Sequence, residues 1–148
     1  MADPLTPDIC VIGAGPGGLA VALGAARRGA GVALIEKAAI GGADLAYGGV
    51  PAQAFLAAAR TRETLRRGAA MGVAATLHDV DDDRLARHIK AVVAAAADDV
   101  TAARLTAHGI IVIDGEARFT DRRTVVAGET TIRARRFVIA TGARIATP

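Results

Sequence analysis

A short apolar run followed directly by closely spaced glycines constrains the fold of this chain more than any other feature. The run "DICVIG" (8–13) is typical of a buried parallel strand. The next segment, "PGGLAVALGAARRG" (16–29), has the density of small and apolar residues that suits a helix packed on a sheet, with Gly29 as its stop. The segment "GVALIEK" (31–37) then predicts a second strand that ends in an acid. Together the three segments predict a βαβ unit of about 30 residues.

The glycines between the first strand and the helix have the spacing of a dinucleotide-binding fingerprint, G-x-G-x-x-G. Gly13 permits a tight turn, Gly15 lets the backbone approach a pyrophosphate, and Gly18 allows the helix to lie close to the strand. The helix N-terminus then presents free N–H groups to the anion. Glu36 ends the second strand, where an acid accepts from ribose hydroxyls, which favours FAD or NAD over NADP. The fingerprint leaves FAD and NAD open, and a glycine-rich turn without a nucleotide is the alternative interpretation.

The rest of the chain continues an α/β pattern. Pro51 suits the first turn of a helix to about Arg67, and a longer helix is predicted from about Asp82 to Ala107, with acids at its start. Three β segments follow: a buried strand over "GIIVIDGEARF" (109–119), an antiparallel hairpin or meander over 123–137, and an apolar strand over "RFVIATG" (136–142). We therefore expect one α/β domain with a parallel sheet, flanking helices and a small antiparallel β-meander.

Composition narrows the class of protein further. Aromatic residues are only 3% of the 148 residues, and many of the apolar residues are small. Small apolar side chains suit close packing of helices on a sheet, so the composition favours an α/β fold over an all-β fold. The net charge is +3 and the arginines are scattered without aromatic interleaving, so we do not expect nucleic-acid binding. The single cysteine, Cys10, excludes an intrachain disulfide and a Cys/His zinc site, and three dispersed histidines have no metal-ligand spacing. No membrane span or basic leader is expected, and a cytoplasmic location is the default.

Four blocks of the sequence resemble, in order and spacing, the FAD-binding domain of a known family. They are residues 8–37, 41–60, 109–125 and 135–148. The family is the pyridine nucleotide–disulfide oxidoreductases, which include dihydrolipoamide dehydrogenase and mercuric reductase. The resemblance implies a Rossmann-like domain of the glutathione-reductase type, with FAD as its cofactor.

The resemblance also assigns candidate cofactor-binding residues by position. Lys37 is a further candidate beside Glu36, although a solvated surface charge is its more ordinary role. For Thr141 and Gly142, the alternative interpretation is a packed strand end followed by a turn glycine, with no contact to the cofactor. The implied contacts are the pyrophosphate for Gly13, Gly15, Pro16 and Gly18, the ribose for Glu36, the adenine edge for Ala117, the pyrophosphate and flavin for Gly41 and Gly42, and the vicinity of FAD for Ala140, Thr141 and Gly142.

The sequence departs from the family in the segment "GGADLAYGGVPAQ" (41–53). Members of the family carry G-G-x-C, four residues, and then C-I-P-S-K, whereas this chain has Asp44 and Gly49 at the two cysteine positions and Ala52 and Gln53 in place of the serine and lysine. A dithiol relay needs two sulfurs in disulfide geometry, so the segment lacks that chemistry. Asp44 could exchange a proton near the flavin, but a solvated acid is the more ordinary interpretation, and no catalytic residue is assigned.

The family's complete enzymes also have a nicotinamide-binding domain and a dimerisation domain. We interpret residues 1–148 as the first half of the FAD-binding domain, without these two domains, and as either part of a longer polypeptide or a reduced protein. A homodimer is expected only where the dimerisation domain exists. The first functional hypothesis is a portion of an oxidoreductase that takes hydride from NAD(P)H and passes electrons to an acceptor other than a disulfide. The alternative is a non-catalytic or degenerate nucleotide-binding module.

Overall fold

A four-stranded parallel sheet forms the centre of the molecule. The computed structural model describes residues 3–73, 76 and 79–143. The sheet has the strand order β3-β2-β1-β7, and Ile9 pairs with Val32 on one side and with Arg136 on the other. Its strands are β1 (Ile9–Ile12), β2 (Val32–Glu36), β3 (Ile110–Asp114) and β7 (Arg136–Ile139). The parallel sheet predicted from the apolar runs is confirmed.

A second, antiparallel sheet of three strands covers one face of the parallel sheet. It consists of β4 (Ala117–Asp121), β5 (Thr124–Ala127) and β6 (Thr130–Arg133), in the order β4-β5-β6. Ile12 and Ile35 of the parallel sheet share a buried cluster with Val125 and Ile132 of this meander. The predicted small meander is therefore present, and it forms one outer layer.

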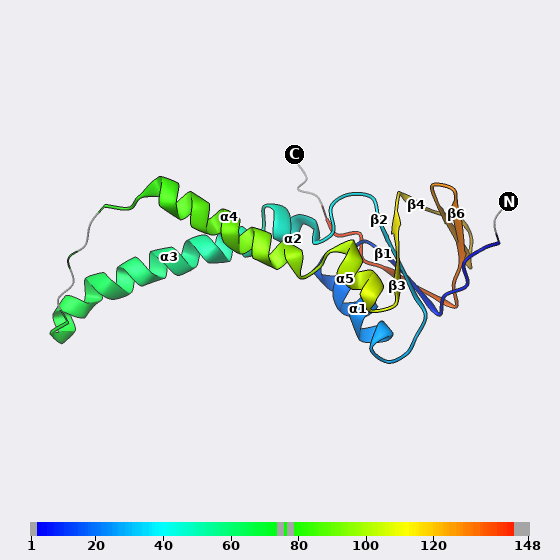
Figure 1. The fold of residues 1–148 in the computed structure, drawn as a ribbon, viewed down its shortest axis with the longest axis horizontal. Helices are drawn as coiled ribbons and strands as arrows, with labels where there is room; N and C mark the ends of the chain where they lie inside the picture. Colours follow the sequence, from blue (N-terminus) through cyan, green and yellow to red (C-terminus); the bar gives the residue numbers. More distant parts are fainter. Residues whose placement is uncertain (1–2, 74–75, 77–78, 144–148) are drawn as a thin grey trace.

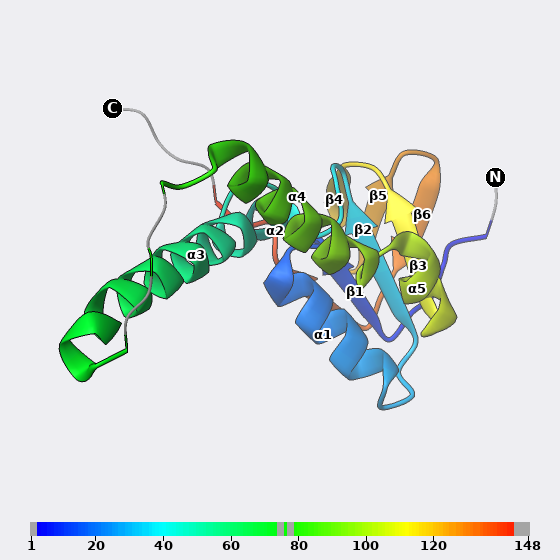
Figure 2. The same cartoon turned by 60° about the vertical axis from the view of Figure 1, so that its left-hand side comes forward.

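Two helices cover the opposite face. They are α1 (Pro16–Ala26) and α5 (Ala102–Ala107), which Figure 2 shows in front of the parallel sheet. Leu19 and Leu105 from these helices pack with Leu34 and Ile110 from the sheet. Alternate residues of each buried strand thus face the helices and the meander, as the period of two along a strand requires.

The remaining helices form a hairpin that extends away from the sheets (Figures 1 and 2). Its two long helices, α3 (Gly49–Gly68) and α4 (Asp82–Asp98), pack on one another, and the short helices α2 (Gly42–Ala46) and η1 (Ala69–Met71) adjoin α3. Asp81 caps α4 by accepting a hydrogen bond from the backbone N–H of Arg84 at 2.8 Å. No helix within residues 3–73 and 79–143 is long and apolar enough to cross a membrane.

Two predicted elements were too long. The helix predicted over 82–107 ends at Asp98, and a separate helix, α5, begins after Thr101, whose hydroxyl accepts from the backbone N–H of Arg104 at 3.3 Å. A side-chain cap of this kind starts a new helix and breaks the apolar periodicity. The strand predicted over 109–119 is also two strands, because Gly115 has φ +150° and redirects the chain from the parallel sheet to the meander.

The element boundaries near the glycine-framed segment also differ from the prediction. Helix α3 begins at Gly49 and holds Pro51 in its first turn, as predicted, but residues 42–46 form the short helix α2, which was not predicted. Gly41 precedes α2 with φ +102°, a conformation that favours glycine.

The three-layer packing predicts where truncation is costly. Leu34→Ala removes a fully buried side chain between the sheet and the helices, and should lower the free energy of unfolding by about 2–5 kcal/mol. Ile111→Ala, in the neighbouring strand at 45% exposure, is the control and should cost clearly less. Urea unfolding followed by circular dichroism measures both. Equal losses for the two variants would contradict the assignment of the core.

Candidate functional site

The turn between β1 and α1 lies in close contact with the ends of its neighbouring strands. The backbone N–H of Gly13 donates to the carbonyl of Ile35 at 2.8 Å, and the N–H of Ala140 donates to the carbonyl of Ile12 at 2.8 Å. Gly13 has φ +103°, and a Cβ there would collide with the carbonyl oxygen of Ala140. A Cβ on Gly18 would collide with the carbonyl of Gly13 in the same way. These two glycines are therefore required by the protein's own packing.

Gly15 differs, because none of the described atoms requires it to be glycine. A Cβ built there meets nothing within 4 Å, and the residue has an ordinary φ of −74°. It is the N-cap of α1, and no described side chain caps this helix. The first N–H groups of a helix have no partner inside the helix. The missing side chain thus leaves open backbone at an uncapped, electropositive helix end, which is the arrangement that binds a phosphate group.

A second glycine pair closes against this turn. The N–H of Gly41 donates to the carbonyl of Ala14 at 2.8 Å. A Cβ on Gly42, which has φ +62°, would lie 3.1 Å from the Cα of Gly15. The structure thus brings Gly41 and Gly42 against the fingerprint turn.

The carboxylate of Glu36 is held against the same turn. Its Oε2 accepts from the backbone N–H of Ala14 at 2.6 Å, and its Oε1 accepts from the N–H groups of Lys37 and Ala38, both at 2.9 Å. A carboxylate offers about four acceptor positions, so a ligand hydroxyl could still bind. Glu36 therefore keeps acceptor positions open, and it also joins the end of β2 to the glycine turn.

Sequence reasoning did not single out Ala14, which connects these parts. Its N–H binds Glu36 and its carbonyl binds Gly41, while its side chain is fully buried. Because only its backbone acts, the residue type carries no signal beyond its position inside the fingerprint.

Lys37 and Ala117 lie beside the turn between β3 and β4. The Nζ of Lys37 forms an ion pair with Oε1 of Glu116 at 2.8 Å, and both side chains are more than half exposed. The N–H of Gly115 donates to the carbonyl of Glu36 at 2.9 Å, which places Ala117, the first residue of β4, next to the end of β2. The ion pair favours the role of a surface charge for Lys37 over that of a phosphate ligand.

The last predicted segment follows β7. Ala140 is half-buried against Gly13, whereas Thr141 and Gly142 are exposed. Gly142 has φ +72°, and a Cβ there would meet none of the described atoms within 4 Å. Pro16, at the start of α1, is also exposed. All these residues surround the carboxyl edge of the parallel sheet, the usual ligand-binding edge of such sheets.

The segment that departs from the family's cysteine motif forms an unexpected contact. Oδ1 of Asp44 accepts from the backbone N–H of Gly49 at 3.1 Å, at the start of α3, whose N-cap Gly48 has no side chain. A Cβ on Gly49 would collide with this oxygen and lie 2.9 Å from Cγ of Asp44. Asp44 is exposed, but it also caps a helix, so the interpretation of a merely solvated acid was incomplete. The two residues at the cysteine positions depend on each other.

This contact predicts strongly non-additive substitutions. Gly49→Ala should lower stability by about 0.5–2 kcal/mol, because the exposed Asp44 carboxylate must turn away from the new methyl group and loses its hydrogen bond, and Asp44→Ala should cost about the same for the lost cap. In the double variant the overlap is gone and alanine is the better helix former, so Gly49→Ala should then be neutral or stabilising. Urea unfolding of the four proteins gives the coupling energy. Costs that simply add would contradict the contact.

The part of the chain that the structure describes contains no group of three His, Cys, Asp or Glu side chains that could hold a metal ion. Cys10 lies inside β1 and is fully buried. Burial raises the pKa of its thiol to about 11. Cys10 therefore packs as a small buried hydrophobe.

A glycine turn at an uncapped helix, with an acid at the end of the next strand, defines a Rossmann-like nucleotide-binding domain with an added meander. The sequence pattern of the family described as "Pyridine nucleotide-disulphide oxidoreductase" matches residues 7–148, and the chain belongs to this family. It corresponds to the family's N-terminal FAD-binding portion, so the resemblance and the fold class stated from the sequence are both confirmed.

Individual relatives agree with this assignment. Dihydrolipoyl dehydrogenase of Bacillus subtilis (strain 168) is 35% identical over 145 residues, which cover 95% of this chain and 31% of that protein. Mercuric reductase of Bacillus cereus is 28% identical over 141 residues, or 95% of this chain and 22% of that protein. The structure of the HOCl-induced flavoprotein disulfide reductase RclA from Escherichia coli is similar in fold, with a TM-score of 0.70, 23% identity, and coverage of 95% of this chain and 29% of that one. The chain thus spans less than a third of the length of these proteins.

Proposed function

We propose that this chain binds FAD as the first half of the FAD-binding domain of an oxidoreductase that takes hydride from NAD(P)H and passes electrons to an acceptor other than a disulfide. The open backbone at Gly15, on the uncapped end of α1, is the observation that supports FAD binding most directly. The family supports FAD over NAD at this site, because the chain corresponds to the family's N-terminal FAD-binding portion.

The residues around the carboxyl edge fit the parts of a dinucleotide. The first turn of α1 would hold the pyrophosphate through N–H groups beside Gly15, and Gly42 keeps the second loop close enough to enclose it. Glu36 would accept from the ribose hydroxyls with its remaining acceptor positions. Ala117 would border the adenine, and the segment Ala140–Gly142 would border FAD after β7.

Bound FAD would supply the two-electron chemistry, and the chain's own side chains limit which acceptors the electrons can reach. The sequence has one cysteine, Cys10, which is buried within β1. Asp44 and Gly49 hold each other in a helix cap and supply no sulfur. Because a disulfide acceptor requires a nearby dithiol relay, we propose an acceptor other than a disulfide, such as a quinone, a dye or oxygen.

A nucleotide-binding module without turnover is the second candidate. It is favoured by the contact between Asp44 and Gly49, which gives both residues a structural role at the positions where the family carries its cysteines. The two candidates predict the same binding site and differ in whether reduced pyridine nucleotide is consumed.

The role of Glu36 can be tested by its removal. Glu36→Ala should weaken FAD binding by about 1–3 kcal/mol, the scale for losing hydrogen bonds to a charged group. Glu36→Gln keeps the shape of the side chain and an acceptor oxygen, and should lose less. Glu63→Gln, on α3 away from the carboxyl edge of the sheet, is the control and should change FAD affinity little. Flavin fluorescence titration measures all three, and an unchanged affinity in Glu36→Ala would overturn the ribose assignment.

The absence of a dithiol can be tested by counting electrons. The FAD-loaded protein should take up about two electrons per flavin in an anaerobic reductive titration, without the further two that a redox disulfide contributes. Alkylation of the native protein should be slow, because Cys10 is buried with its pKa raised to about 11, and should become fast in urea. Uptake of about four electrons, or turnover with a disulfide substrate that alkylation abolishes, would refute the proposal.

A further inference from the structure

A cluster of arginines lies at the edge of the parallel sheet opposite the glycine turn. Arg123, Arg133, Arg135 and Arg136 line a surface depression of about 530 Å³. A second depression of about 580 Å³ shares Arg123 and Arg133 with the first and adds Arg122. The two depressions therefore form one basic surface, which we call the arginine surface.

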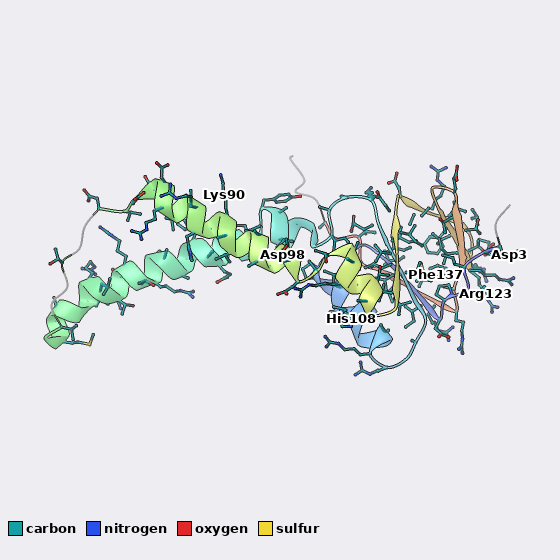
Figure 3. All side chains as sticks on the ribbon, viewed as in Figure 1. Asp3, Lys90, Asp98, His108, Arg123 and Phe137 are labelled. Atoms are coloured by element: carbon teal, nitrogen blue, oxygen red, sulfur yellow. The ribbon has the colours of Figure 1, made fainter. Side chains whose placement is uncertain are left out.

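The arginine surface is built by three segments that the fold brings together. Residues 4–7 run beside β6, with the N–H of Arg133 donating to the carbonyl of Leu5 at 2.8 Å. The β4–β5 turn supplies Arg122 and Arg123, and the segment from β6 to β7 supplies the other three arginines. Figure 3 shows Arg123 and Asp3 at the end of the molecule away from the helical hairpin.

This surface is separate from the candidate cofactor site. Arg136 pairs with Ile9 at the amino ends of β7 and β1, whereas Gly13 and Ala140 follow the carboxyl ends of the same strands. Each strand has four residues, so roughly 13 Å of strand lies between the two edges. A ligand at one edge does not occupy the other.

Positive charge exceeds negative charge on this surface. Arg135 pairs with Asp8 at 3.0 Å, while no hydrogen bond or ion pair within the described residues engages the guanidinium groups of Arg123 and Arg133. Asp121 is the nearby acid. The pKa of its carboxyl is lowered mainly by the hydrogen bond from the backbone N–H of Arg123, and to a smaller extent by the charge of Arg133. Five arginines thus face two carboxylates, and among the described residues the guanidinium groups of three of them, Arg122, Arg123 and Arg133, have no hydrogen bond or ion pair.

The residues that line the surface indicate the chemistry of a ligand. Among the described residues, no aromatic side chain lines either depression, so a nucleobase has nothing to stack on, and Pro7 and Ala134 are the main apolar residues of the first. Guanidinium forks match the oxygens of phosphate groups, and depressions of several hundred Å³ suit small ligands. We propose that the arginine surface binds a small polyphosphate anion through Arg123 and Arg133, at a site distinct from the nucleotide site.

Titration with tripolyphosphate, followed by amide NMR of the 148-residue chain, tests this site. We expect saturable shifts in residues 121–136 that persist when FAD is present and weaken as salt rises. Arg123→Gln/Arg133→Gln should weaken binding at these residues at least tenfold. Arg60→Gln/Arg62→Gln, on α3, removes the same charge elsewhere and should leave the affinity unchanged.

Three results would overturn the proposal. The first is the absence of saturable shifts in residues 121–136, and the second is equal weakening by both double variants, which indicates diffuse attraction. The third is shifts confined to residues 13–18 that FAD abolishes, which indicates binding at the glycine turn alone. Because Arg123 and Arg133 are exposed, the Arg123→Gln/Arg133→Gln variant should keep the circular dichroism spectrum of the unmodified protein. If that variant unfolds, Arg122→Gln/Arg136→Gln should weaken binding at the same residues.

Discussion

The close approach of the β1–α1 turn to the end of β7 is the constraint on which the candidate site depends. Gly13 lies against the carbonyl of Ala140, and Gly18 lies against Gly13, so neither position has room for a Cβ. This packing sets α1 directly over the sheet with its N-terminus at the carboxyl edge. Gly15, where a Cβ would meet none of the described atoms, is then left at the surface as an open approach to the helix end.

Hydrogen bonds from side chain to backbone hold the neighbouring loops to this turn. Glu36 joins the end of β2 to Ala14, and Ala14 in turn accepts from Gly41. Three loops that are distant in sequence therefore share one small region of backbone. A substitution at Glu36 affects both the ligand contacts we propose and the shape of the turn, which is why a glutamine variant is informative beside alanine.

The two edges of the parallel sheet have opposite chemical characters. At the carboxyl edge, glycines and a helix end offer N–H groups, with one carboxylate to receive hydroxyl donors. At the amino edge, arginine side chains provide the charge. Backbone donors need close approach and hence glycine, whereas guanidinium groups reach a ligand across several ångströms and tolerate exposed strand ends.

The sequence by itself determined the βαβ unit, the meander and the residues proposed for the nucleotide site, because these depend on local patterns. Strand periodicity, glycine spacing and an acid at a strand end act within a few residues of one another. Only the tertiary structure decided the break at Thr101, the redirection at Gly115, the cap between Asp44 and Gly49 and the arginine surface. The break at Thr101 depends on a side-chain cap, and the redirection at Gly115 depends on a backbone angle, whereas the apolar pattern of the sequence runs on without interruption at both places. The arginine surface depends on segments far apart in the chain that meet only when both sheets have packed.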